Sequence, residues 1–429
     1  MSILSSSPLS GDNNVEMNSL SPTFSTLIAP LEAQLPYLTP LASRSNRPLD
    51  YTFDFQVRAL VYYHTEAFTS AQDLLQAAPE DPLANQLIVP STGLGESTFY
   101  EANATRGSQQ LLELVDRLAK KVSKQLKVPH PALGALVAID GSLIDASLSM
   151  GWAEYTSTRH KAKAHLGFDL NRGLPRQLAL TEGNGAERAF VSTFLEPDET
   201  GVLDRGYVDY QGFDRWIDEG KHFVARIRKN AHREVLESRP IPPGTALFFF
   251  AKVRLGDEAH RMRHPLFLVG FKSRGTIYWL VTDRADLSAE QIAFIFALRW
   301  EIESFFAWWK KHLEVYHLIS RNPHGVLLQL LAGLVTYLLL VLYFHQQYGE
   351  RPSLRRLRQV RRQIRQETAI AYLTIYNMDI LLALILILGS SRNIMVPLSQ
   401  RDGRNVHKPL WQPRQPLPSL FQRGHGFLG

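Results

Sequence analysis

Residues 296–310 read FALRWEIESFFAWWK, and helical periodicity sorts them into two faces. Four side chains fall within an arc of about 60° at 3.6 residues per turn: Phe296, Arg299, Glu303 and Lys310. A separate sector is apolar: Leu298, Ile302, Phe305, Phe306, Trp309 and Leu313. The pattern predicts one buried helix that holds a carboxylate beside two cations along a polar seam.

This seam has two interpretations. A carboxylate flanked by cations suits chemistry on phosphates, because the carboxylate can bind Mg²⁺ while Arg and Lys bind the DNA backbone. An ordinary amphipathic helix with an i,i+4 pair between Arg299 and Glu303 has the same pattern. The helix alone does not decide between them, and two other stretches of the chain favour the first.

Composition restricts the classes of protein to consider. The chain has 429 residues, 45% of them hydrophobic and 21% charged, which is enough for a large core and more than one domain. Its net charge of +6 and pI of about 9.3 fit a polyanionic partner without requiring one. The absence of cysteine excludes disulfides, cysteine-bound zinc and thiol nucleophiles, and it fits a reducing compartment. The first residues lack a basic region followed by an apolar one, so we expect no signal peptide.

Residues 326–344 form an apolar stretch close to the ~20 residues that span a bilayer. A membrane span and a buried core helix both fit this length. The amphipathic helix that precedes the stretch could pack over its faces, and charged helices lie on both sides. We therefore predict a core helix and no membrane partner.

The order of patterns predicts five regions. Residues 1–50 form a loosely structured arm, and residues 51–128 form a helical region. In that region glycines precede a helix expected to expose Tyr100, Asn103 and Arg106. This layout resembles a helix-turn-helix DNA-binding element, and a generic helical bundle fits equally. Residues 229–283 are rich in strands and form an insertion, and residues 346–429 form a basic helical region and tail.

Between these regions, residues 129–228 alternate strands with helices, which predicts a mixed α/β sheet with flanking helices. Two apolar strands end in acids, Asp140 and Asp204. The carboxyl ends of parallel strands are where such folds place active sites. Together with Glu303, these acids could hold two metal ions roughly 3.5–4 Å apart, one activating the attacking oxygen and one stabilising the leaving 3′ oxygen. Any one of them alone would be an ordinary loop or capping residue.

With these residues in place, the sequence resembles the DDE transposases of bacterial insertion sequences. It is most similar to the insertion sequence four family, whose last catalytic helix carries a tyrosine, arginine, glutamate and lysine. Residues 138–142 and 203–207 resemble the segments around the first two acids, and Arg299, Glu303 and Lys310 match the third at the family's spacing. The resemblance covers about residues 50–345. It departs from the family at Phe296, which replaces the signature tyrosine and removes a hydroxyl contact to DNA.

The resemblance implies a ribonuclease H-like catalytic core at residues 129–228 and 284–345, interrupted by the insertion, behind an N-terminal DNA-binding region. It implies that Asp140, Asp204 and Glu303 bind Mg²⁺, with Mn²⁺ as a possible substitute and two ions expected. The activity implied is cleavage at transposon ends and strand transfer into target DNA. Better-known members of the family form a hairpin intermediate. A transposase-derived protein that binds DNA without cutting it is the second hypothesis.

Partners follow from the same resemblance and from charge. We expect double-stranded DNA at the transposon ends and the target, a homodimer on DNA, and a place in the bacterial cytoplasm at the nucleoid. Seven side chains are predicted to contact DNA: Phe296, Arg299, Lys310, Tyr207, Arg355, Arg358 and Arg362. The last three belong to an arginine-rich segment, residues 351–365, that would bind phosphates in a salt-dependent way.

Overall fold

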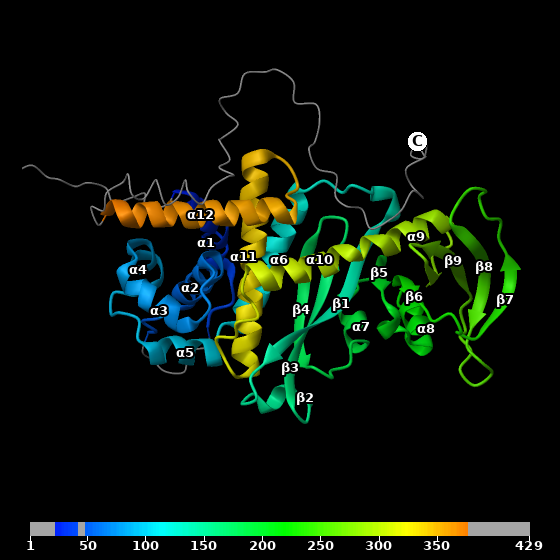
Figure 1. Ribbon diagram of the computed structural model, residues 1–429, viewed down its shortest axis with the longest axis horizontal. Coiled ribbons are helices and arrows are strands. Elements are labelled where there is room, and N and C mark those ends of the chain that lie inside the picture. Colours follow the sequence, from blue (N-terminus) through cyan, green and yellow to red (C-terminus); the bar gives the residue numbers. More distant parts are fainter. Residues whose placement is uncertain (1–21, 42–47, 376–429) are drawn as a thin grey trace, which may run out of the picture.

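A computed structural model describes residues 22–41 and 48–375, and it has the predicted mixed α/β architecture. A large sheet lies between helices, with α1–α5 at one end of the molecule and β7–β9 at the other (Figure 1). The helices are α1 Pro22–Glu32, α2 Phe53–Glu66, α3 Ala71–Glu80, α4 Pro82–Ile88, α5 Glu96–Thr105, α6 Ser108–Gln125, α7 Ala189–Phe194, α8 Tyr210–Asp218, α9 Ala289–Leu298, α10 Trp300–His312, α11 Pro323–Tyr348 and α12 Leu354–Ile375. The strands are β1 Ala135–Ala146, β2 Glu154–Thr156, β3 Arg159–Asp169, β4 Leu174–Glu182, β5 Glu199–Leu203, β6 His222–Arg226, β7 Arg233–Ser238, β8 Leu247–Leu255, β9 Leu266–Ser273 and β10 Thr276–Thr282.

The strands form one mixed sheet in the order β2-β3-β1-β5-β6-β10-β9-β8-β7, with β4 also paired to β3. The three central strands, β1, β5 and β6, run parallel, while β3 pairs antiparallel with β1 and β4 pairs antiparallel with β3. The strands of segment 229–283 join this sheet directly, because β10 pairs with β6 along residues 280–282 and 224–226. The strands of the predicted insertion are therefore hydrogen-bonded to the central strands as part of the same sheet.

The two faces of the sheet bury different clusters, as alternating side chains require. Leu136 and Ala138 of β1 pack in the larger cluster, with apolar residues of α6, α9, α10 and α11. Val137 and Ile139 point to the opposite face and pack with α7 and α8, whose largest contributions are Phe213 and Trp216. Side chains of β1 therefore contact α10 only when they point to the first of these two faces of the sheet.

The N-terminal helices pack on α11, and one prediction about them is wrong. Asn103 of α5 was expected to be exposed, but it is only 2% exposed. Its Oδ1 accepts a hydrogen bond from Nε2 of Gln56 on α2 at 3.1 Å. The partner lies 47 residues away, so helical periodicity could not show that this polar group is satisfied inside the bundle.

The single helix predicted over residues 296–310 is also wrong in one respect, because the chain divides at Arg299 into α9 and α10. The amide of Arg299 donates to the carbonyl of Phe296, and the amide of Ile302 donates to the carbonyl of Arg299, so the turn tightens to i→i+3 spacing. Arg299 keeps helical dihedral angles, φ −53° and ψ −28°. The two helices therefore continue in nearly the predicted phase, with Phe296 on the first and Glu303 on the second.

The apolar segment forms α11, a helix long and apolar enough to cross a membrane by length and composition. Within its most apolar 18 residues, 94% of the positions are buried, which confirms the prediction of a buried helix. Its Gly333 lies against α10: a Cβ atom there would come within 2.8 Å of Nε1 of Trp309. Glycine thus allows close approach of the helix that carries Glu303.

We predict that Gly333→Ala destabilises the protein. Overpacking costs about 1–3 kcal/mol, which outweighs a gain of up to about 1 kcal/mol from alanine's helix propensity. Urea unfolding should show the loss. Gly151→Ala is the control, because a Cβ atom at Gly151 meets nothing within 4 Å. Equal stabilities of the two variants would contradict close packing of α11 on α10.

Candidate active site

The first two acids lie level with each other on neighbouring strands. In the parallel pair of β1 and β5, Ala138 is in register with Val202, so two residues further on Asp140 is level with Asp204. Asp204 directly follows β5 with an extended backbone (φ −87°, ψ 176°). Ala138 and Val202 both belong to the cluster on the α10 face. The two carboxylates therefore start from the same edge and the same face of the sheet.

Glu303 reaches this face from α10, and Arg299 connects it to β1. Nη2 of Arg299 lies 2.8 Å from Oε1 of Glu303, and Nη1 lies 3.9 Å from Oδ2 of Asp140. The Arg299 side chain is only 7% exposed, against 23% for Asp140 and 32% for Glu303. One buried cation thus bridges two of the three predicted acids.

Burial raises the pKa of Asp140 to about 6. Arg299 and a 2.9 Å hydrogen bond from the Gly141 amide act in the opposite direction, while the charges of Glu303 and Glu187 raise the pKa further. The carboxyl group of Asp140 is thus largely buried with other acids nearby, a combination that is typical of functional sites.

Asp204 has a different arginine beside it. Nη1 of Arg226, on β6, lies 3.7 Å from Oδ1 of Asp204. The Arg226 guanidinium also lies over the ring of Tyr278, 4.7 Å from its centroid. Oδ1 of Asp204 is buried and accepts no hydrogen bond from the described residues. This acid therefore keeps an unsatisfied oxygen at the site, which a buried group normally avoids.

Three predicted DNA contacts are engaged inside the protein. Nζ of Lys310 donates to the carbonyl of Leu143 on β1 at 2.6 Å, and burial lowers its pKa. Phe296 is 5% exposed, with Arg299 lying 5.4 Å from its ring centroid. In this structure the polar seam therefore fastens α10 to β1, and the contacts of these residues with DNA stay predictions.

Tyr207 ends a short 3₁₀ turn, Arg205–Tyr207, that follows Asp204. It is 1% exposed, and its hydroxyl has no hydrogen-bond partner among the described residues. Burial raises its pKa, and the charges of Asp140, Glu187 and Asp204 raise it further, while Arg299 lowers it. The hydroxyl thus shares the electrostatic environment of the acids.

The donor set suits a hard divalent cation, since carboxylate oxygens are its preferred ligands and Asp204 offers a buried oxygen without a hydrogen bond. The three acids are not preassembled, however. Within residues 22–41 and 48–375, no group of three or more His, Cys, Asp or Glu side chains is arranged to hold a metal ion. Arg299 faces Asp140 and Glu303, and Arg226 faces Asp204.

The arginine-rich segment forms the first half of α12. Arg355, Arg358 and Arg362 are exposed, as a phosphate-binding surface requires. Arg361 is instead 8% exposed, and burial lowers its pKa to about 10. The charges of Arg358 and Arg361 reach His312 at the end of α10, so this basic surface lies beside the helix that carries Glu303.

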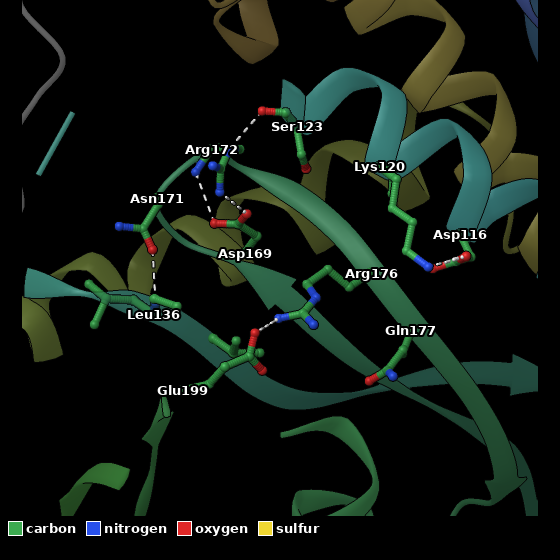
Figure 2. A pocket seen from close by; sticks show the side chains of 13 residues that line it. Asp116, Lys120, Ser123, Leu136, Asp169, Asn171, Arg172, Arg176, Gln177 and Glu199 are labelled. Carbon is green, nitrogen blue, oxygen red and sulfur yellow. Dashed lines mark hydrogen bonds and ion pairs between the residues drawn. The ribbon is translucent and has the colours of Figure 1, made fainter. Parts of the chain in front are cut away.

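A cavity of about 250 Å³ lies at the other end of β5, near its first residue, Glu199. Figure 2 shows that its charged side chains are paired: Arg176 with Glu199, Arg172 with Asp169, and Lys120 with Asp116. This cavity is therefore remote from Asp204, and its mutually compensated charges indicate a structural role.

Two site residues were not predicted from the sequence. Glu187 lies in the loop between β4 and α7, and Tyr278 supports Arg226 from β10. Neither is part of a motif. The glycines near the acids, Gly141 and Gly206, were a usable signal for close approach, but a single sequence does not say which side chain comes close.

Comparisons with known proteins indicate the family to which the segment carrying these acids is similar. Residues 132–339 match the family described as "Transposase DDE domain". "Putative transposase y4zB" of Sinorhizobium fredii is 28% identical over 253 residues, which cover 57% of this chain and 70% of the relative. "Putative transposase for insertion sequence element IS4SA" of Synechocystis is 27% identical over 257 residues, which cover 57% and 71%.

A solved structure, a piggyBac transposase synaptic complex with hairpin DNA, aligns with 82% of this chain and 78% of that chain. The identity is 12% and the TM-score 0.42, too low to support an inference. The family match and the two relatives do support one: residues 132–339 form a DDE transposase domain, and the chain is similar to the transposases of bacterial insertion sequences.

We predict that Arg299→Gln lowers the free energy of unfolding by about 1–3 kcal/mol, because it removes a buried cation that pairs with two partly buried carboxylates. Arg351→Gln is a matched control, since Arg351 pairs with Glu301 of the same helix in an exposed position, 2.6 Å apart. Its loss should stay below about 1 kcal/mol. Urea unfolding compares the two, and equal losses would contradict the bridging role of Arg299.

Proposed function

We propose that Asp140, Asp204 and Glu303 form the catalytic centre of this transposase, which cuts DNA at the ends of its element and joins them to a target. The observation that carries the proposal is the convergence of the three acids. Asp140 and Asp204 are level on parallel strands, and one arginine links Asp140 to Glu303. The family match covers all three residues.

We also propose that the core is ribonuclease H-like. Three antiparallel strands, β4, β3 and β1, are followed in the sheet by two strands parallel to β1, which supports this assignment. Residues 129–228 and 284–345 would form this core, with 229–283 as an insertion and 346–429 as the basic C-terminal region. Residues 51–128 would form the DNA-binding region.

The family generally uses divalent metal ions. We propose that Asp140, Asp204 and Glu303 hold Mg²⁺ or Mn²⁺, with two ions bound. Bound in this way, the ions would supply an activated oxygen nucleophile and stabilise the leaving 3′ oxygen. Arg299 and Arg226 would then release the carboxylates that they face here. Burial around Asp140 would exclude water and strengthen each charge interaction.

DNA would bind across the basic surface of α12, through Arg355, Arg358 and Arg362, and reach the seam of Arg299, Lys310 and Phe296. Tyr207, three residues after Asp204, would also contact DNA. We propose a homodimer on DNA in the bacterial cytoplasm, at the nucleoid. The burial of α11 supports the proposal that no membrane is involved.

The test is cleavage of labelled DNA that carries the element's own ends, with Mg²⁺. We expect Glu303→Gln to lower the rate at least about 100-fold while DNA binding persists, because several kcal/mol of charge stabilisation is lost. Glu301→Gln is the matched control, since Glu301 lies on the same helix and pairs with Arg351.

Equal cleavage by the Glu303→Gln and Glu301→Gln variants would contradict the assignment of Glu303. Binding without cleavage by the wild-type protein would favour a transposase-derived DNA-binding protein that no longer cuts.

A further inference from the structure

Glu187 places a fourth carboxylate between the two strand segments that carry acids. Both carboxylate oxygens of Glu187 lie close to a glycine. A Cβ atom added to Gly141 would lie 3.2 Å from Oε1 of Glu187, and a Cβ atom added to Gly206 would lie 3.0 Å from Oε2. Gly141 follows Asp140, and Gly206 is two residues after Asp204. Because glycine lacks a side chain, the carboxylate can enter the notch between these segments.

Contacts on two sides hold the Glu187 loop in this position. Nζ of Lys163, on β3, lies 3.2 Å from Oε1 of Glu187 and donates to the carbonyl of Gly185 at 3.3 Å. Nε of Arg188 donates to the carbonyl of Gly206 at 3.2 Å. The loop is thereby fastened to β3 on one side and to the segment after Asp204 on the other.

A second observation points into the same place. The Tyr207 hydroxyl, buried and without a hydrogen-bond partner among the described residues, interacts with the charges of Asp140, Asp204 and Glu187. Its electrostatic environment therefore includes two predicted acids and Glu187. A buried hydroxyl without a hydrogen-bond partner near these acids points to a ligand at this place.

We propose that Glu187 is a fourth acidic residue of the active site and takes part in binding the divalent cation beside Asp140 and Asp204. The proposal rests on the proposed function. The four carboxylates of this cluster face three cations in the structure: Arg299, Arg226 and Lys163. Lys163 would compete with the bound cation for Glu187, in the way that Arg299 does for Asp140 and Glu303.

The alternative is that Glu187 only forms an ion pair with Lys163. Mn²⁺ binding to the full chain, followed by electron paramagnetic resonance without DNA, separates the two. We expect Glu187→Gln to weaken Mn²⁺ binding about tenfold, the order found when groups around a metal site are removed. Glu182→Gln is the control, because Glu182 is an exposed acid at the end of β4. We expect Lys163→Met to tighten binding, since it removes a competing charge.

Equal Mn²⁺ affinity of the Glu187→Gln and Glu182→Gln variants would overturn the inference, as would equal weakening by Lys163→Met and Glu187→Gln. Thermal unfolding in chelator checks that each variant is folded, and Glu187→Asp, which keeps the charge, should bind Mn²⁺ more tightly than Glu187→Gln. Asp140→Asn separates this inference from the proposed function. If it abolishes Mn²⁺ binding and Glu187→Gln does not, only the inference fails; if neither has an effect, the proposed metal site fails as well.

Discussion

The arrangement of the site depends on one buried guanidinium, that of Arg299. It joins a carboxylate in the middle of β1 to a carboxylate on α10, and its other face lies against the ring of Phe296. Carboxylates gathered in a partly buried space repel one another, so a positive charge between them stabilises this arrangement. In this structure arginines provide that charge, and a bound divalent cation would provide it during catalysis.

The sheet decides where these carboxylates meet. β5 ends at Leu203 while β1 continues to Ala146, so the edge beside Asp140 is open on one side. Asp204 enters that space directly after β5, and Glu187 enters it between two glycines. The helix that carries Glu303, α10, packs against α11. Gly333 of α11 lacks a side chain and so allows the two helices to approach closely. The backbone pattern therefore places groups that are more than a hundred residues apart in the sequence.

Much of this was predictable from local pattern. The short strand before Asp204, the burial of Trp309 and the buried apolar helix follow from short-range periodicity. The predicted end of the first strand at Asp140 is wrong, because β1 stays paired with β3 and continues to Ala146. The break at Arg299, the burial of Asn103 and the approach of Glu187 were not predictable, because each depends on partners from distant segments or on a small change in helical hydrogen bonding. The i,i+4 pair of Arg299 with Glu303 could be read from the sequence. The pairs of Arg299 with Asp140 and of Arg226 with Asp204 could not, because their partners lie far apart in the chain.

The central claim, that the three acids share one cation-binding site, is tested most directly by replacing Mg²⁺ with Fe²⁺ and mapping where hydroxyl radicals cut the chain. We predict cuts near residues 140, 204 and 303 together, all suppressed by excess Mg²⁺ and lost in Asp204→Asn. Cuts at only one of these segments, or cuts that Mg²⁺ does not suppress, would contradict a shared site.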